Sequence, residues 1–532
     1  MIRAGAMLAW PAERYPDKVA ITCENRDMTF REVDARVNRL ANGLLALGLQ
    51  RGDRVAALLD NSPRAIETRF ALMKAGLCMV ALNVRQAPEE HAYILNDSDS
   101  RVLILDAAYE PVWESIRHQC TGVSDVIVAA AEAGPFLDYE EVIASASEMA
   151  PEVMVELDDL ERIAYTSGTT GRPKGIMKTI GNDLARLRND FLNEEQLTGP
   201  DDVMLNVAPL THAARVLFRK HYLKGARNLI FNRFDEETIL QAMERERVTT
   251  AMFVPTMIIR LVVHPKVSDY DVSSLQRVFF GTAPIPPDKF DRAISIFGNV
   301  FRQNYGLSEA TQPVLSLTPQ DLAGVDEDLR QHRLASAGRP ALGVEVRIAN
   351  EQGEAVARGE EGELLIRGEI VMRGYWKNSE ATREVLDAEG WLHTGDMAWQ
   401  DADGFITISG RKKDMIISGG FNVYPREVER VIEAHAGVQE VAVVGVPDTV
   451  WGESVAAFVV PRSGVALTPE AIVDVCKAHI ASYKKPQVVE IVDDLPKNFQ
   501  GKILKRALLE QYLQRAGSST EAGDECSGQA IS

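Results

Sequence analysis

A run rich in glycine, hydroxyl side chains and one lysine interrupts an apolar part of the sequence. Residues 165–175 read Tyr-Thr-Ser-Gly-Thr-Thr-Gly-Arg-Pro-Lys-Gly, so Lys174 stands between a proline and a final glycine. Glycines let the backbone turn tightly and approach a ligand closely, and backbone N–H groups, hydroxyls and an ammonium group together bind an anion. The P-loop of common NTPases ends in Gly-Lys-Ser/Thr, which is absent here. The run predicts a polyphosphate-binding loop of another kind.

Four other segments carry side chains suited to the same ligand. Residues 305–309 offer a ring that can stack on adenine, a hydroxyl for phosphate and a carboxylate for Mg²⁺. Asp396 follows a glycine, and its carboxylate can accept both hydroxyl hydrogen bonds of a ribose. Charged residues at 411–414 precede two glycines, and residues 496–502 contain two lysines. Each segment alone is also compatible with an ordinary turn or a solvated surface.

Composition limits the classes of protein that this chain can belong to. With 532 residues, 45% of them hydrophobic and 25% charged, it is expected to form two or more globular domains. A net charge of −19 argues against broad binding to nucleic acid or to an anionic membrane. The five cysteines show no CxxC spacing, which favours reduced thiols in the cytoplasm. No signal peptide or membrane span is expected.

Hydrophobic periodicity predicts alternating strands and helices in the first part of the chain. Residues 29–32 form a capping box that opens a helix ending near Gly48, and apolar strands are expected at 55–59 and 102–105. The same alternation returns in residues 203–305, which indicates parallel α/β layers. Residues 121–156 are rich in Ala and Glu and are expected to form a surface connection.

The pattern changes in the last third. Short strands separated by Gly-rich turns at about 335–410 predict a small β-barrel or antiparallel layer, and an α+β pattern begins after Arg411. The expected fold is α/β: a large N-terminal domain with layered α/β subdomains and a small β-barrel, and a smaller, mobile α+β C-terminal domain. The expected boundaries are 1–410 for the N-terminal domain, 411–413 for a hinge, 414–515 for the C-terminal domain and 516–532 for a disordered tail.

Taken together, these motifs resemble those of the adenylate-forming superfamily, over roughly residues 8–512. Ser-Gly-Thr-Thr-Gly-x-Pro-Lys, Tyr-Gly-x-Ser-Glu, Thr-Gly-Asp and Pro-Lys-Asn-x-x-Gly-Lys occur in the family's order. Residues 418–425, Ser-Gly-Gly-Phe-Asn-Val-Tyr-Pro, resemble the acyl-CoA synthetase branch in particular. The chain departs from the family at Ser308, where Thr is usual, and at Thr282, where a second Gly is usual.

The resemblance implies an ATP-dependent carboxylic acid–CoA ligase that uses ATP, Mg²⁺ and coenzyme A. An acyl-adenylate and pyrophosphate form first, and the CoA thiol then displaces AMP after the small domain rotates on its hinge, Lys413. Catalytic roles are implied for Lys502, which would bridge the substrate carboxylate and the α-phosphate, and for His212 and Glu309. The implied ATP- and AMP-binding residues are Thr166, Ser167, Gly168, Thr169, Thr170, Gly171, Lys174, Gly281, Thr282, Ala283, Asn304, Tyr305, Gly306, Ser308, Asp396 and Arg411.

The same resemblance implies sites for the other ligands. Glu309 and Thr170 would hold the metal ion. The implied CoA-binding residues are Gly419, Gly420, Trp451, Tyr483 and Lys485, with core packing as the alternative for Trp451 and solvation for Lys485. The implied acyl pocket includes His212, Ala213, Arg215 and Pro255.

Arg215 stands where relatives usually carry glycine, which predicts either a polar or anionic substrate tail or an arginine paired elsewhere. Other functions remain open from the sequence: a stand-alone adenylating enzyme, a peptide-synthetase adenylation domain, a luciferase, or a non-catalytic nucleotide-binding homologue. The acid itself is also open between aromatic, medium-chain, long-chain and polar types, with fatty acid metabolism as one setting. The expected partner is this small acid, a homodimer is left open, and no binding to nucleic acid is expected.

Overall fold

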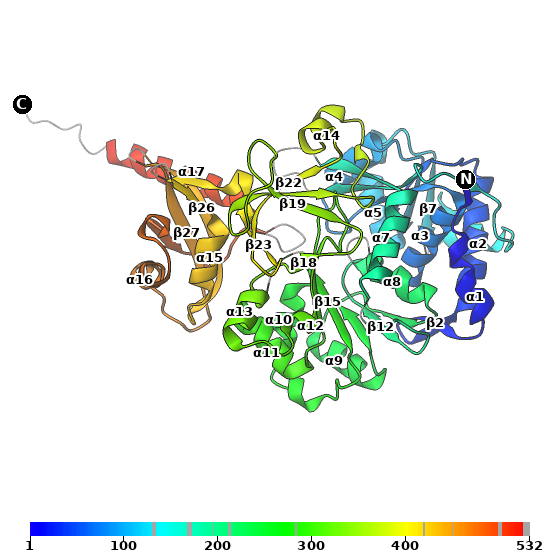
Figure 1. Ribbon diagram of the computed structural model, residues 1–532. Coiled ribbons are helices and arrows are strands. Elements are labelled where there is room, and N and C mark those ends of the chain that lie inside the picture. The colour runs from blue at the N-terminus through cyan, green and yellow to red at the C-terminus, as the bar shows by residue number, and fades with distance from the viewer. Residues whose placement is uncertain are drawn as a thin grey trace, which may run out of the picture. The chain divides into compact units, whose positions relative to one another are not determined.

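A computed structural model describes residues 1–129, 135–166, 173–194, 196–210, 214–281, 283, 285–418, 421–448, 451–497 and 503–524 (Figure 1). Contacts within the chain divide it into two compact units. Unit 1 comprises Met1–Val346, Leu365–His393 and Gly404–Ile406, and unit 2 comprises Arg347–Leu364, Thr394–Asp403 and Thr407–Ser532. The boundaries expected from the sequence remain a prediction.

The first sheet of unit 1 carries the predicted phosphate run at one of its strand ends. Its strand order is β21-β11-β10-β5-β4-β6-β7-β8. The strands are β21 (Gly374–Tyr375), β11 (Lys174–Thr179), β10 (Leu160–Thr166), β5 (Cys78–Ala81), β4 (Arg54–Leu58), β6 (Val102–Asp106), β7 (Asp125–Ala129) and β8 (Leu137–Asp138). Strands β10, β5, β4, β6 and β7 pair in parallel, which confirms the predicted parallel layer.

The second sheet of unit 1 carries the predicted adenine-side segments. Its order is β18-β17-β16-β15-β14-β12-β13-β2-β3. The strands are β18 (Arg339–Pro340), β17 (Leu315–Leu317), β16 (Phe301–Tyr305), β15 (Arg277–Gly281), β14 (Thr250–Met252), β12 (Val203–Asn206), β13 (Arg227–Ile230), β2 (Val19–Cys23) and β3 (Arg26–Thr29). Strands β16, β15, β14, β12, β13 and β2 pair in parallel, as the repeated strand–helix pattern predicts.

Helices connect and cover the strands of unit 1. Thr29 caps α2 (Phe30–Ala46): its side chain accepts from the Glu32 backbone, and Glu32 accepts from the Thr29 backbone, so the predicted capping box is confirmed. The other helices are α1 (Trp10–Arg14), α3 (Pro63–Ala75), α4 (Pro88–Asp97), α5 (Glu110–Ile116), α6 (Tyr139–Ala144), α7 (Ile180–Leu192), α8 (Ala214–Leu223), α9 (Glu236–Arg245), α10 (Pro255–Val263), α11 (Pro287–Phe297), α12 (Pro319–Leu322), α13 (Glu327–Leu334) and α14 (Ser379–Val385). A short pair, β1 (Ile2–Arg3) with β9 (Met154–Val155), joins two distant segments.

The expectation that 121–156 is a surface connection is wrong. Strand β7 lies within this segment and pairs with β6 inside the first sheet. Ile127 and Val128 are fully buried there. Strands in parallel sheets are covered on both faces and read as short apolar runs, and the Ala- and Glu-rich surroundings of Asp125–Ala129 obscure this one.

The region between 345 and 411 forms a four-stranded sheet in the order β19-β20-β22-β23. Its strands are β19 (Glu345–Ala349), β20 (Glu361–Arg367), β22 (Leu392–Gln400) and β23 (Ile406–Arg411). Strands β19, β20 and β23 match the predicted short strands, whereas β22 was not predicted, and the boundary between the two compact units falls within the sheet.

The C-terminal part of unit 2 is the predicted α+β layer. Figure 1 shows α15 and α16 packed along strands β26 and β27. Its elements are β24 (Ile416–Ser418), β25 (Phe421–Val423), α15 (Pro425–Glu433), β26 (Val438–Asp448), β27 (Gly452–Pro461), α16 (Pro469–His479), β28 (Val488–Ile491) and α17 (Lys505–Asp524).

Helix α17 runs past residue 516, where the sequence predicts that a tail begins. It extends to Asp524, so 516–524 is helical, whereas 525–532 lies outside the described residues. Extending an existing helix adds one hydrogen bond for each residue fixed, which favours continuation past the predicted end. In the described part of the chain, no helix is both long and apolar enough to cross a membrane.

Candidate active site

The predicted phosphate run lies between two paired strands of unit 1. Strand β10 enters the run and β11 leaves it, with Thr166 opposite Lys174 and Tyr165 opposite Gly175 in antiparallel register. Residues 167–172, which include Ser167, Gly168, Thr169, Thr170 and Gly171, lie outside the described residues, as does the side chain of Thr166. The antiparallel pairing brings the two ends of the predicted loop together at the end of the sheet.

Side chains of α4 anchor both ends of this run. The Tyr165 hydroxyl donates to the Asp97 carboxylate at 2.5 Å, and the Tyr93 hydroxyl donates to the Pro173 carbonyl oxygen at 3.1 Å. A Cβ on Gly175 would lie 2.8 Å from the Ile163 side chain, so a glycine is required there. Helix α4 therefore fixes where the loop begins and where it ends.

Lys174 and Glu309 meet the same tyrosine. The Lys174 ammonium lies 5.0 Å from the centroid of the Tyr375 ring, and the Tyr375 hydroxyl donates to the Glu309 carboxylate at 2.9 Å. Burial raises the pKa of Tyr375 and the Glu309 charge raises it further, so the phenol stays protonated and remains a donor. Tyr375 thus contacts both the lysine that the sequence predicts to bind phosphate and the glutamate that it predicts to bind the metal ion.

Sequence reasoning missed Lys178, which is 2% exposed near the end of β11. Its ammonium group donates to the backbone oxygens of Glu309 at 2.9 Å and Ile370 at 3.1 Å. Burial lowers its pKa to about 7, and the positive charge of Arg162 lowers it further. A lysine within an apolar, strand-like run was the signal in the sequence that could have identified it.

The adenine-side segments pack closely at the ends of β15 and β16. A Cβ on Gly281 would lie 2.3 Å from the Asn304 carbonyl oxygen, and one on Gly306 would lie 2.7 Å from the Gln312 backbone nitrogen. The Asn304 side chain accepts from the Ser316 hydroxyl at 2.9 Å. The backbone in this region therefore requires glycine at both positions.

The remaining predicted residues of this group differ in exposure. Tyr305 is half-buried, whereas Ser308 and Ala283 are exposed and accessible to a ligand. Thr282 lies outside the described residues.

The predicted ribose ligand forms an ion pair in unit 2. The Arg411 Nε atom lies 2.7 Å from the Asp396 carboxylate, and Arg411 Nη1 donates to the Thr394 backbone oxygen at 3.0 Å. Asp396 is 4% exposed, and Gly395 before it has a φ of +68° while its N–H donates to Glu363 at 3.0 Å. The turn and the arginine together hold a buried carboxylate in one orientation.

Only part of the predicted CoA site is described. Gly419 and Gly420 lie outside the described residues, but they are the whole connection between β24 and β25, in which Ser418 pairs with Phe421. Trp451 is 52% exposed, so the alternative that it packs in the core is wrong. Tyr483 is also exposed. Two exposed aromatic rings fit a surface on which a nucleotide base can stack.

The lysines of this group take part in local contacts. Lys485 is half-buried, and its ammonium contacts the Ser482 carbonyl oxygen at 3.4 Å. Lys413 lies in the short turn Lys412–Asp414 and is exposed. These observations do not test the roles that the sequence predicts for Lys485 and Lys413.

The predicted acyl pocket lies mostly outside the described residues. This holds for His212 and Ala213 and for the side chain of Arg215, whereas Pro255 is buried at the first position of α10. Lys502 also lies outside them, although the pairing of Lys497 with Ile503 encloses its segment.

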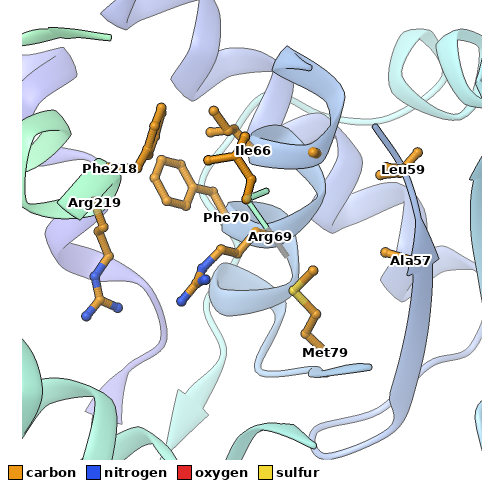
Figure 2. Close-up of a pocket in the computed structure, with 10 residues that line it drawn as sticks. Ala57, Leu59, Ile66, Arg69, Phe70, Met79, Phe218 and Arg219 are labelled. Atoms are coloured by element: carbon orange, nitrogen blue, oxygen red, sulfur yellow. The ribbon is translucent and has the colours of Figure 1, made fainter. Parts of the chain in front are cut away.

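A cavity lies between α3, α8 and β4 (Figure 2). Its water-accessible space is about 30 Å³, enough for a water molecule and too small for an aromatic or aliphatic acid. In Figure 2, Phe70 and Phe218 lie beside each other, and Arg69 and Arg219 extend in the same direction below them. Pro255, the described residue of the predicted acyl pocket, does not line this cavity.

Its arginines belong to a buried network of charges between the helices and the first sheet. Arg69 lies 3.0 Å from Glu161, and Arg219 pairs with Asp183 of α7. Burial raises the pKa of Asp183, but Arg219, Arg186 and Arg69 outweigh that effect and hold it well below its usual value. Removing one partner of such a buried pair typically costs about 3–5 kcal/mol, because the other charge is left buried and uncompensated.

The family of the chain follows from its similarity to known proteins. The model of the AMP-binding enzyme family matches residues 8–376, and that of the AMP-binding enzyme C-terminal domain matches residues 427–502. The chain belongs to the AMP-binding enzyme family. The sequence-based identification of the adenylate-forming superfamily is thereby confirmed.

Three relatives within this family narrow the activity. Feruloyl-CoA synthase from Amycolatopsis sp is 41% identical over 510 residues, which are 95% of this chain and 98% of the relative. The medium/long-chain-fatty-acid–CoA ligase FadD8 from Mycobacterium tuberculosis is 34% identical over 96% of this chain and 90% of its own length. The crystal structure of the anthranilate CoA ligase AuaEII in complex with anthranoyl-AMP matches with a TM-score of 0.87 and 28% identity, covering 97% of this chain and 98% of that one.

The activity follows from this membership and from these relatives. The protein is an AMP-forming acyl-CoA synthetase that joins a small carboxylic acid to coenzyme A at the expense of ATP. Its fold agrees with those of adenylating relatives, which have a large N-terminal and a small C-terminal domain.

Proposed function

We propose that the acid is an aromatic acid of the phenylpropenoate class, such as ferulate. The observation that supports this is the 41% identity to feruloyl-CoA synthase over 95% of the chain, compared with 34% to a fatty-acid–CoA ligase. The similarity to the anthranilate CoA ligase points in the same direction, because anthranilate is also aromatic. A fatty acid is the competing class, supported by FadD8.

In this proposal the predicted residues act in the two half-reactions as follows. Lys174 and the preceding loop bind the ATP phosphates, Tyr305 stacks on adenine, and Asp396 holds the ribose diol. A carboxylate oxygen of the acid attacks the α-phosphorus, the bond to pyrophosphate breaks, and Lys502 stabilises the charge that develops. The CoA sulfur then attacks the acyl carbon, its proton passes to solvent, and AMP leaves. Rotation at Lys413 between the two steps would exchange the faces of the small domain.

We also propose Mg²⁺ as the metal, with Glu309 as its ligand and Thr170 as a second. Mg²⁺ is usually held by one or two carboxylates together with substrate phosphates, and the Tyr375 hydroxyl holds the Glu309 carboxylate in place at 2.9 Å. Among the described residues no group of three or more ligating side chains occurs, which agrees with an ion completed by ATP. When bound, the ion neutralises charge on the phosphates.

A panel of acids tests the substrate class. We expect kcat/KM for ferulate, measured as AMP formation with ATP and CoA, to exceed that for octanoate by at least about tenfold, equivalent to about 1.4 kcal/mol. p-Coumarate, benzoate and palmitate complete the panel. A higher kcat/KM for octanoate or palmitate than for ferulate would contradict the proposal and place the enzyme with the fatty-acid ligases.

Gly420→Leu is expected to impair CoA transfer selectively. A side chain at this position would obstruct the path of pantetheine, so acyl-CoA formation from pre-formed acyl-adenylate should fall by at least about tenfold, while pyrophosphate release is retained. Gly420→Asn is the control for the short β24–β25 connection, because Asn suits tight hairpin turns. Unchanged CoA transfer in Gly420→Leu would exclude the assignment.

Location and assembly complete the proposal. A cytoplasmic protein is supported by the cysteines of the described residues, Cys23, Cys78, Cys120 and Cys476, which are buried free thiols. A net charge of −19 supports the absence of nucleic-acid binding. We also propose a homodimer, which light scattering of the purified protein will distinguish from a monomer.

A further inference from the structure

We propose that Lys178 is a positioning residue that fixes Glu309 relative to the strand that carries Lys174. Lys174 and Lys178 both belong to β11 and stand four positions apart, so their side chains leave the strand on the same face. One lysine therefore meets the Tyr375 ring, and the other meets the backbone of Glu309. This inference rests on the proposed role of Glu309 as a metal ligand.

The contacts of Lys178 are specific to the segment that carries Glu309. The Glu309 carbonyl oxygen accepts from Lys178 Nζ at 2.9 Å and from the Met372 backbone nitrogen at 2.7 Å. Lys178 Nζ also donates to the Ile370 oxygen at 3.1 Å, and Ala310 pairs with Val371. One ammonium group thus joins β11 to two segments that are far apart in the sequence.

An apolar side chain would fill this buried position without the free-energy cost of desolvating a charged group. Lys178 is 2% exposed, its ammonium donates to two backbone carbonyl oxygens, and the carboxylates of Glu309, Glu161 and Asp183 act on its charge. Burying a cationic group is unfavourable unless hydrogen bonds and opposite charges compensate the lost hydration. The two carbonyl oxygens that it engages fix the backbone immediately beside the metal-binding carboxylate.

Positioning of Glu309 has a consequence for ATP binding. The Tyr375 hydroxyl donates to the Glu309 carboxylate, and Lys178 donates to the backbone carbonyl oxygen of the same residue. Groups that orient a metal ligand typically change metal affinity or activity by about 10- to 100-fold when they are removed. Loss of Lys178 should therefore weaken metal binding in the ATP complex without affecting steps that need no metal.

The test uses the full-length enzyme with ATP and Mn²⁺ as a spectroscopic substitute for Mg²⁺. Lys178→Met retains length and removes the donors, and electron paramagnetic resonance should show Mn²⁺ affinity lowered by about 10- to 100-fold. The Mg²⁺ concentration needed for half-maximal pyrophosphate release should rise in parallel. Lys178→Arg, which keeps the positive charge and N–H donors, should recover most of the affinity. Formation of acyl-CoA from pre-formed acyl-adenylate should be unaffected in Lys178→Met.

Asn182 provides the matched control. Its side chain donates to the backbone oxygens of Glu369 and Val371, flanking Ile370, but it does not contact Glu309. If Lys178 only ordered the 369–371 segment, Asn182→Ala would lower Mn²⁺ affinity equally, and that result would overturn the proposal. Unchanged Mn²⁺ affinity in a folded Lys178→Met enzyme would also overturn it.

Glu309→Gln separates this proposal from the one on which it rests. If Glu309→Gln leaves Mn²⁺ affinity unchanged, Glu309 is not the metal ligand and both proposals fail. If Glu309→Gln lowers it and Lys178→Met does not, only the role of Lys178 is wrong. The identity of the acid substrate does not enter these measurements, because Mn²⁺ and ATP are their only ligands.

Discussion

Replacing Lys502 by alanine should lower the rate of adenylation by at least about 10²- to 10³-fold, the typical effect of removing one group that stabilises charge in a transition state. The physical reason is that a lysine bridging the attacking carboxylate and the α-phosphate reduces the repulsion between two anions. The C-terminal family model ends at residue 502, which agrees with a motif that includes this lysine. Pyrophosphate release with the acid and ATP measures the effect.

The second half-reaction and a neighbouring lysine make this test specific. Acyl-CoA formation from pre-formed acyl-adenylate should be retained in Lys502→Ala, because no pyrophosphate has to leave in that step. Lys497 is the matched control: it pairs with Glu440 at 2.6 Å and Asp494 at 3.2 Å, so Lys497→Ala should leave adenylation within a few-fold of the parent. Equal losses in both half-reactions of Lys502→Ala would contradict the assigned role.

Asp396→Asn should lower kcat/KM for ATP by about 10²-fold or more. The amide keeps the size of the carboxylate but loses the charge that strengthens two hydrogen bonds to the ribose hydroxyls, each worth about 1.5–3 kcal/mol. It also leaves Arg411 without the carboxylate that now lies 2.7 Å from its Nε atom. The loss should appear in both half-reactions, because the acyl-adenylate carries the same ribose.

The control for Asp396→Asn is a carboxylate–guanidinium pair without a ligand role. Arg367 and Glu345 lie 2.6 Å apart on the surface, and such exposed pairs contribute at most about 1 kcal/mol. Glu345→Gln should therefore change neither kcat/KM for ATP nor the melting temperature appreciably. An Asp396→Asn enzyme with normal kcat/KM for ATP would show that this carboxylate does not bind the ribose.

Local chemistry explains why so much of the architecture was predictable. The Thr29 capping box and the apolar strands expected at 55–59 and 102–105 depend on neighbours within a few residues, and they form as expected. Strand β7 is the exception, because a short apolar run does not reveal by itself that both of its faces are covered.

Along the chain, the motif residues are defined by type and spacing, which a sequence states directly. The sequence by itself determined the family, the position of the phosphate run, and the order in which Lys174, Glu309, Asp396 and Lys502 occur.

Only the tertiary structure decided which of these residues touch and what supports them. Tyr375 contacts Glu309 although the two are 66 positions apart in the sequence, and Lys178 contacts it although they are 131 positions apart. Neither contact leaves a local pattern in the sequence. Likewise, the pairing of Arg411 with Asp396 depends on the turn at Gly395 and on the register of strands β22 and β23. Such contacts arise when separate elements pack into one core, because side-chain distances are then set by the packing of whole strands and helices rather than by neighbouring residues.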